Sequence, residues 1–212
     1  MRRCVIVGGS HITNYNEIKN RLRQDDFFVF CDGGLEHAAA LGRRPDLIVG
    51  DFDSFDHSRL TAMGFDGIET IKLPREKDDT DTVFAAKEAL SRGFDEFLLI
   101  GVIGKRLDHT LGNTSLLLML HNAGAKASVI DDYSEMEIAG DAPVYVEDKY
   151  SYFSLLNIFG PVSGVYISDA KYPLDGAEIS CDYQYGISNE VIPNKKACIR
   201  VTEGKLLLVK VF

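Results

Sequence analysis

The sequence of 212 residues predicts an α/β domain followed by an all-β domain. Up to about Ile130, apolar strand-like runs alternate with amphipathic segments, which favours a mostly parallel sheet with helices on both faces. After "DDYSE", short apolar runs follow one another with Gly, Pro and Asp between them, as in an antiparallel sandwich or barrel. We therefore expect one domain at residues 1–131 and a second at residues 132–212.

Six apolar runs predict the strands of the first domain. In chain order they are "RCVIV", "FFVFC", "DLIVG", "IETIKL", "EFLLIG" and "ASVI". Between the fourth and fifth runs, "DTDTVFAAKEALSRG" places Val83, Ala86 and Leu90 at helical spacing. Thr80 or an Asp can cap the start of this helix, and Gly93 stands where a helix end favours glycine.

A second helix is predicted in "LDHTLGNTSLLLMLHNAG", with Asp108 near its start and Gly124 just past its end. The strands expected in the second domain are "APVYVE", "SYFSLLNIF", "GVYISDA", "KACIRV" and "KLLLVKVF".

Composition and charge narrow the class of protein. The formal net charge of −9 disfavours a nucleic-acid partner, because such proteins need a basic face to displace counterions from phosphates. No segment approaches the roughly 20 apolar residues of a membrane span, and the apolar run near the N-terminus is too short for a signal peptide. We expect a cytoplasmic protein. The four cysteines lack C-x-x-C spacing, so buried thiols are expected rather than a zinc site or disulfides.

Acidic residues follow four consecutive predicted strands, at the carboxyl ends where open parallel sheets bind ligands. They are Asp32 after "FFVFC", Asp51 and Asp53 after "DLIVG", Asp78, Asp79 and Asp81 after "IETIKLP", and Asp108 after "EFLLIG". Carboxylates on one edge repel one another unless a cation neutralises them, and oxygen ligands suit Mg²⁺ better than zinc. The sequence therefore predicts a Mg²⁺ site at this edge.

Glycines and basic residues near the same strand ends suit an anion. Glycines let backbone amides approach a phosphate closely, at Gly33, Gly34, Gly101 and Gly104. Lys105 and Arg106 would add charge-assisted hydrogen bonds to that phosphate. Carboxylates for a metal together with cations for a phosphate are typical of phosphoryl transfer.

Simpler interpretations remain open for single residues. Asp32, Asp78 and Asp108 can each be a turn former or a helix cap, and His109 beside a helix start can be a packing residue instead of a base. Gly8-Gly9 after the first strand is either a nucleotide loop or a tight turn.

The D-x-D of Asp51 and Asp53 places two carboxylates on one side of an extended backbone. It also resembles the start of a haloacid-dehalogenase-type phosphatase, with Asp51 as nucleophile and Asp53 as acid/base, and with Asp131 and Asp132 as a later metal motif. This alternative finds no further motifs of that fold, and it leaves the all-β second half unexplained.

A second resemblance covers nearly the whole chain. "CDGGLEHAAALGRRPDLIVGDFDS", "EKDDTDT", "GVIGKRLDHTLGN", "AKYPL" and "GISNE" stand in the order and near the spacings seen in thiamine pyrophosphokinases. The resemblance implies transfer of a pyrophosphoryl group from ATP to the hydroxyl of thiamine, giving thiamine diphosphate and AMP, with Mg²⁺ required. It further implies a catalytic first domain that binds the nucleotide and a second domain that binds thiamine.

The same resemblance implies a role for individual residues. Those that would hold Mg²⁺ and the triphosphate are Asp32, Asp51, Asp53 and Asp81. Those on the ATP side would include Gly33, Asp78, Thr80, Arg106, Asp108 and His109. Catalysis would fall to Asp51, Asp53, Asp81 and Arg106, and thiamine would be recognised by Tyr172, Ser188 and Asn189. The ring face of Tyr172 suits a cationic thiazolium, although an ordinary core tyrosine is the alternative.

Members of this family are homodimers that hold thiamine between the first domain of one subunit and the second domain of the other, so a homodimer is expected. Two segments depart from the family pattern. "GVIGKR" stands in place of G-G-x-G-G-R, with Val102 and Lys105 replacing small residues. After D-G-G, the segment from Leu35 to His37 reads "LEH", which leaves those three residues without an assigned role.

Overall fold

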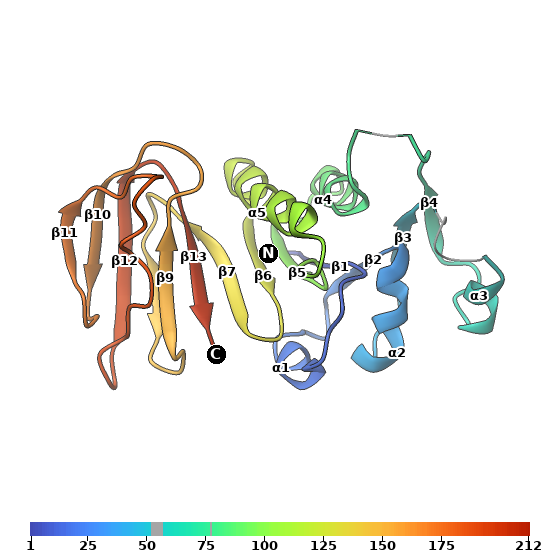
Figure 1. The fold of residues 1–212 in the computed structure, drawn as a ribbon. Coiled ribbons are helices and arrows are strands. Elements are labelled where there is room, and N and C mark those ends of the chain that lie inside the picture. Colours follow the sequence, from blue (N-terminus) through green and yellow to red (C-terminus); the bar gives the residue numbers. More distant parts are fainter. Residues whose placement is uncertain (52–56, 77) are drawn as a thin grey trace. The chain divides into compact units, whose positions relative to one another are not determined.

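The computed structural model describes residues 1–51, 57–76 and 78–212, and the chain forms two compact units, Met1–Asp132 and Tyr133–Phe212. In the first unit, six parallel strands lie in the order β4-β3-β2-β1-β5-β6 (Figure 1). Their bounds are β1 (Arg3–Val7), β2 (Phe27–Cys31), β3 (Leu47–Gly50), β4 (Glu69–Lys72), β5 (Glu96–Ile100) and β6 (Lys126–Ile130). All six coincide with the predicted apolar runs.

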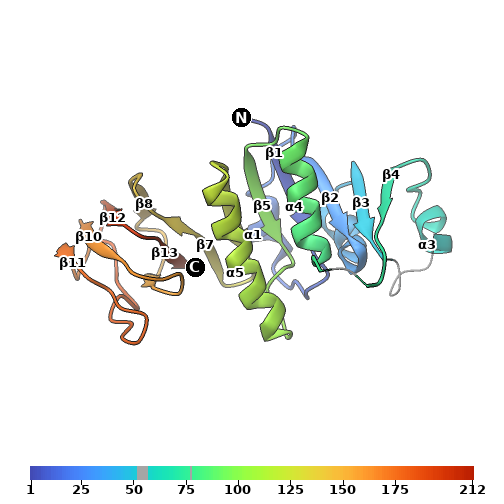
Figure 2. The same ribbon diagram turned by 90° about the horizontal axis from the view of Figure 1, so that it is seen from above.

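Helices cover both faces of this sheet, as predicted. The helices of the first unit are α1 (Tyr15–Lys19), the 3-10 helix η1 (Asp32–His37), α2 (Ala38–Leu41), α3 (His57–Ala62), α4 (Asp81–Ser91) and α5 (Leu107–Asn122). Helices α4 and α5 lie on one face, and α1 and α2 lie on the other (Figures 1 and 2). Both predicted long helices are confirmed. Thr80 caps α4 by accepting a hydrogen bond from the Val83 amide (3.3 Å), and Gly93 follows α4 with a φ of 81°.

Burial explains why these runs are apolar. Every residue of β3 and β5 is buried, as expected for central parallel strands covered on both faces, whereas the outermost strand β4 has no buried residue.

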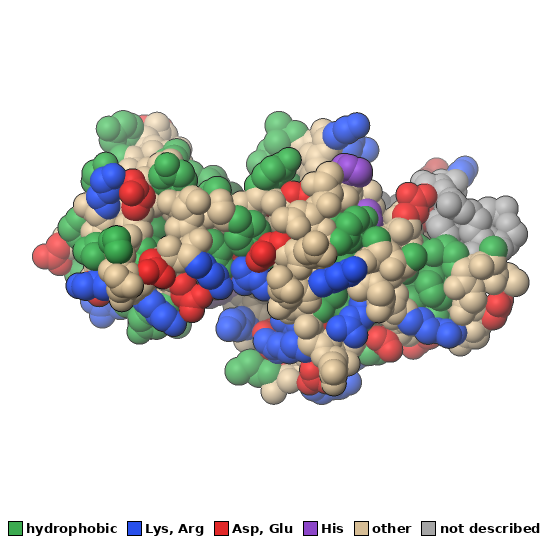
Figure 3. All heavy atoms as spheres, turned by 90° about the horizontal axis from the view of Figure 1, so that it is seen from below, with side chains coloured by type: hydrophobic (Ala, Val, Ile, Leu, Met, Phe, Trp, Pro, Cys, Tyr) green, Lys and Arg blue, Asp and Glu red, His purple; other side chains and the backbone are tan. Residues whose placement is uncertain are grey.

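Lysines and arginines lie among acidic side chains on the face of this unit that carries α1 and α2 (Figure 3). In the described ranges no helix is both long enough and apolar enough to span a membrane.

The second unit contains two antiparallel groups of strands. One has the order β7-β13-β9 and the other β11-β10-β12-β8. Their bounds are β7 (Ser134–Ala139), β8 (Val144–Glu147), β9 (Tyr152–Leu156), β10 (Ser163–Ser168), β11 (Leu174–Ala177), β12 (Lys196–Glu203) and β13 (Leu206–Val211). Strands β7 and β11 were not among the predicted runs, because neither is a continuous apolar segment.

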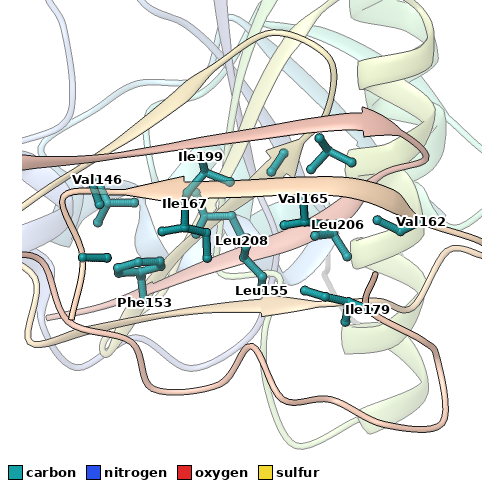
Figure 4. Close-up of a cluster of buried hydrophobic side chains, with 14 of the residues drawn as sticks. Val146, Phe153, Leu155, Val162, Val165, Ile167, Ile179, Ile199, Leu206 and Leu208 are labelled. Atoms are coloured by element: carbon teal, nitrogen blue, oxygen red, sulfur yellow. The ribbon is translucent and has the colours of Figure 1, made fainter. Parts of the chain in front are cut away.

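The core of the second unit lies between these two groups of strands (Figure 4). Phe153 and Leu208 come from one group, and Ile167 and Ile199 from the other; all four are 4% exposed or less. The predicted sandwich-like β-domain is therefore confirmed. The expectation of buried thiols is confirmed for Cys4 and Cys31 and is wrong for Cys181, which is exposed; Cys198 is half-buried, and none of the four cysteines forms a disulfide.

A buried cation links β13 to β7. Lys210, 5% exposed, donates hydrogen bonds to Glu135 (2.7 Å) and Glu137 (2.8 Å), and the Tyr150 hydroxyl donates to Glu135 (2.7 Å). Burial alone would lower the pKa of Lys210, but the two carboxylates outweigh it and raise that pKa. The ammonium therefore stays charged, and it offsets the repulsion between two glutamates on one strand.

We expect Lys210→Ala to lower the free energy of unfolding by about 3–5 kcal/mol, because it leaves two half-buried carboxylates without their cation. The matched control is Lys205→Ala, which removes an ion pair with the exposed Asp141 and should cost under about 1 kcal/mol. Urea denaturation followed by circular dichroism measures both. Equal, small losses in the two variants would contradict a structural role for the buried cation.

Candidate active site

The strand order places a switch point between β1 and β5. The chain runs outward from β1 through β2 and β3 to β4, and it then returns to β5 and β6 on the other side of β1. In open α/β sheets, ligands bind beyond the carboxyl ends of the strands where this reversal occurs. A ligand site is therefore expected at the loops that follow β1, β2 and β5.

Glycines allow these three loops to approach one another closely. The amide of Gly8 donates to the carbonyl of Ile100 (2.9 Å), and the amide of Ser10 donates to the carbonyl of Gly101 (2.8 Å). A β-carbon on Gly34 would lie 2.2 Å from the carbonyl oxygen of Val7, and one on Gly8 would lie 2.6 Å from that of Gly101. No side chain fits at these positions, so Gly8 and Gly34 are required by backbone contacts alone.

Asp32 lies at this edge in a rare backbone conformation. Its φ of 35° is in the left-handed region, which L residues other than Asn and Asp seldom adopt. The pairing of Cys31 with Val49 sets Asp32 level with Gly50, and a β-carbon on Gly50 would lie 3.1 Å from the β-carbon of Asp32. Asp32 thus lies against Gly50, the residue that precedes Asp51, as expected for carboxylates at the ends of adjacent strands.

The remaining acidic residues are positioned by β3 and by the start of α4. Asp51 directly follows β3 and is half-buried, whereas its D-x-D partner Asp53 lies outside the described residues. Asp78 is exposed, and Asp81 is the first residue of α4, where the helix dipole favours negative charge. Thr80 uses its hydroxyl as the cap of α4. In the parts of the chain that the structure describes, no three acidic, histidine or cysteine side chains are gathered into a metal site.

Arg106, Asp108 and His109 stand at the start of α5, beyond the carboxyl end of β5, and all three are exposed. The Arg106 guanidinium binds the Asp108 carboxylate through Nε (2.9 Å) and Nη2 (2.5 Å). These hydrogen bonds hold the pKa of Asp108 well below its ordinary value. The predicted nucleotide-side arginine is therefore oriented by its neighbour in the turn.

In the second unit, Asn189 organises the segment predicted to bind thiamine. It is 5% exposed, and its side-chain oxygen accepts from the Tyr172 amide (3.0 Å) while its side-chain nitrogen donates to the Tyr172 carbonyl (2.8 Å). Tyr172 itself is 58% exposed, so the alternative of a core tyrosine is wrong. Ser188 is exposed, with a φ of 59°, and its amide donates to the Ser154 hydroxyl (3.1 Å). The side chain of Asn189 thus fixes the backbone that presents Tyr172.

Asp132 accepts hydrogen bonds from the loop that follows β1 rather than serving in a second acidic motif. Its carboxylate accepts hydrogen bonds from the Thr13 hydroxyl (2.6 Å) and from the amides of Thr13 (2.9 Å) and Asn14 (2.8 Å). Burial would raise the pKa of Asp132, but these hydrogen bonds outweigh it and lower that pKa. The later metal motif that a haloacid-dehalogenase-type phosphatase requires is not supported by this use of Asp132.

The first unit is a doubly wound α/β domain of the class that binds ligands at the switch point of its sheet. Residues 18–129 match the family "Thiamin pyrophosphokinase, catalytic domain", and residues 143–206 match "Thiamin pyrophosphokinase, vitamin B1 binding domain". The chain belongs to the thiamin pyrophosphokinase family. The resemblance seen in its motifs is confirmed, the protein is an enzyme of this family, and the phosphatase alternative is not favoured.

Individual relatives agree with this assignment. The thiamine pyrophosphokinase of Bacillus subtilis (strain 168) is 24% identical over 212 residues, which cover 99% of each chain. The crystal structure of the Bacillus subtilis enzyme has a TM-score of 0.87 at 22% identity, covering 100% of this chain and 99% of that one. That of the yeast enzyme has a TM-score of 0.78 at 15% identity, covering 100% and 86%. At these identities the solved structures establish the shared fold.

Gly34→Ala is expected to destabilise the first unit by about 1–3 kcal/mol, because the added methyl group would overlap the Val7 carbonyl and push η1 away from β1. The control is Gly112→Ala in α5, where a β-carbon meets open space, and a gain of about 0.5–1 kcal/mol is expected. Thermal unfolding measures the two opposite shifts. A Gly34→Ala variant as stable as the unmodified protein would show that η1 does not need this close approach.

Proposed function

We propose that the protein transfers the pyrophosphoryl group of ATP to the hydroxyl oxygen of thiamine, giving thiamine diphosphate and AMP. The observation that carries this proposal is the order of the two family matches, a catalytic domain over the α/β unit and a vitamin B1 binding domain over the β unit. In the reaction, the thiamine oxygen forms a bond to the β-phosphorus, and the bond between that phosphorus and the oxygen bridging to the α-phosphate breaks. The hydroxyl proton leaves to solvent or to a carboxylate.

Carboxylate oxygens are suitable ligands for Mg²⁺. Asp32, Asp51 and Asp81 stand after β2, after β3 and at the start of α4, and they would supply such oxygens, with Asp53 expected to join them. Mg²⁺ in nucleotide sites is held by one or two carboxylates together with phosphate oxygens and water, so these residues need not form a closed cage before ATP binds. When bound, the metal would neutralise charge on the transferring phosphates.

The residues of the chain would then act mainly by positioning. Gly33 would expose backbone amides to the phosphates, and Arg106 would add positive charge, held in place by Asp108. Asp78, Thr80 and His109 would line the ATP side. Phosphoryl transfer through a loose transition state places little demand on a base, so alignment and charge neutralisation carry most of the catalysis.

On the thiamine side, Tyr172 would stack its exposed ring on the cationic thiazolium, with Ser188 beside it and Asn189 holding the backbone. We further propose a cytoplasmic homodimer in which thiamine lies between the first domain of one subunit and the second domain of its partner. A monomer, isolated by light scattering, that retained full activity would contradict the shared site.

The activity is tested by mixing protein, ATP, MgCl₂ and thiamine and following AMP by chromatography. We expect AMP release that depends on thiamine, stops when a chelator removes Mg²⁺, and returns when Mg²⁺ is added back. Phosphate release from a simple phosphate ester, without thiamine-dependent AMP, would instead favour a phosphatase. ATP binding without turnover would indicate a non-catalytic binding protein.

Asp51→Asn and Asp53→Asn should each lower kcat by on the order of a hundredfold or more without unfolding the protein, because charge stabilisation that acts in the transition state is lost. The control is Asp79→Asn in the neighbouring acidic run, since Asp79 pairs with Lys87 on the surface (2.7 Å). That control should retain turnover within about threefold. Near-normal kcat in a folded Asp51→Asn variant would remove the role assigned to Asp51.

A further inference from the structure

The loop of residues 8–14, which follows β1, is held by side chains from two other strand ends. Asp132, beyond β6, binds Thr13 and Asn14 at the far end of the loop. His37, at the end of η1 beyond β2, reaches the carbonyl of Ser10 in the middle of the loop. The loop therefore has a fixed shape at the switch point of the sheet.

The hydrogen bonds of His37 fix its tautomer. Nε2 lies 3.0 Å from the Ser10 carbonyl oxygen, and Nδ1 lies 2.8 Å from the Tyr15 hydroxyl oxygen. A carbonyl only accepts, so Nε2 carries the hydrogen, and in the neutral ring Nδ1 accepts from Tyr15. His37 is 7% exposed, and this burial lowers its pKa, which favours the neutral ring. One side chain thus joins η1, α1 and the loop.

Ser10 connects this contact to the loop after β5. Its amide donates to the Gly101 carbonyl (2.8 Å), and a β-carbon on Gly104 would lie 2.6 Å from the Ser10 hydroxyl oxygen. A shift of the Ser10 backbone would therefore displace both the loop after β1 and the glycine-containing loop after β5.

We propose that the loop of residues 8–14, at the switch point of the sheet, receives the phosphates of ATP. His37, held in place by Tyr15, is then a positioning residue for ATP, because it fixes the Ser10 carbonyl and thereby the shape of this loop. This inference rests on the function proposed above. It gives a role to the third residue of the "LEH" segment. Loss of the contact between His37 and Ser10 should weaken the binding of ATP, because ATP would then have to order the loop when it binds. The chemical step at the carboxylates should be unchanged.

The test compares variants that keep or lose the contact with Ser10. His37→Gln can still place an N–H near the position of Nε2, whereas His37→Asn reaches only to the position of Nδ1. We expect His37→Asn to raise the KM for ATP and the Kd for ATP with MgCl₂ about tenfold, the effect of one lost hydrogen bond. His37→Gln should stay within about threefold, and Tyr15→Phe should fall between them. The KM for thiamine and kcat should change less than about twofold.

The control is His121→Asn in the last turn of α5, at the opposite edge of the sheet, which should leave the Kd for ATP unchanged. Unchanged ATP binding in folded His37→Asn, or an equal rise in both KM values, would overturn the inference while leaving the proposed function intact. If the unmodified protein binds ATP without forming AMP, the proposed function fails, and the ratio of ATP Kd values still decides the role of His37. Absence of ATP binding in the unmodified protein would overturn both. If His37→Asn does not fold, Tyr15→Phe supplies the same comparison.

Discussion

The first unit depends on close backbone contact between the loops that follow β1, β2 and β5. Gly34 lies against Val7, and Gly8 against Gly101, at distances that exclude any β-carbon. This contact draws η1 onto the sheet and sets Asp32 beside Gly50, immediately before Asp51. The position of Asp32 is therefore a consequence of glycine packing, and the same contacts maintain its left-handed backbone.

Charge is handled differently at the two ends of this sheet. Near the amino ends of the strands, carboxylates are neutralised within the protein, since Arg3 binds the buried Asp26 (2.7 Å) and Arg23 binds Glu96 (2.6 Å). Such pairs fix the geometry of the scaffold. At the carboxyl ends, acidic residues follow several strands in succession. The proposed Mg²⁺, bound together with the nucleotide, would neutralise their negative charge.

Side-chain hydrogen bonds to the backbone shape the irregular parts of the second unit. Asn157, 1% exposed, donates to the Ile179 carbonyl (2.5 Å), and Gln184 donates to the carbonyls of Asn157 (2.8 Å) and Cys181 (3.0 Å). Together with the contacts of Asn189 to Tyr172, they replace the ladder that a regular strand would provide. An exposed segment gains a defined shape in this way, which a recognition surface requires.

The sequence by itself determined the strands and long helices of the first unit, because apolar periodicity and helix caps are local signals. It also placed Asp32, Asp51 and Asp81 after strands, and its motifs indicated the family. The strand β7 was not predicted, because Glu135 and Glu137 interrupt its apolar pattern. These glutamates are neutralised by Lys210, which is over 70 residues away in the chain. Strand order, the need for Gly34, and the contacts of His37 and Asn189 were decided by the tertiary structure, because each joins residues distant in the chain. Contacts of this kind produce no local pattern in the sequence from which they could be predicted.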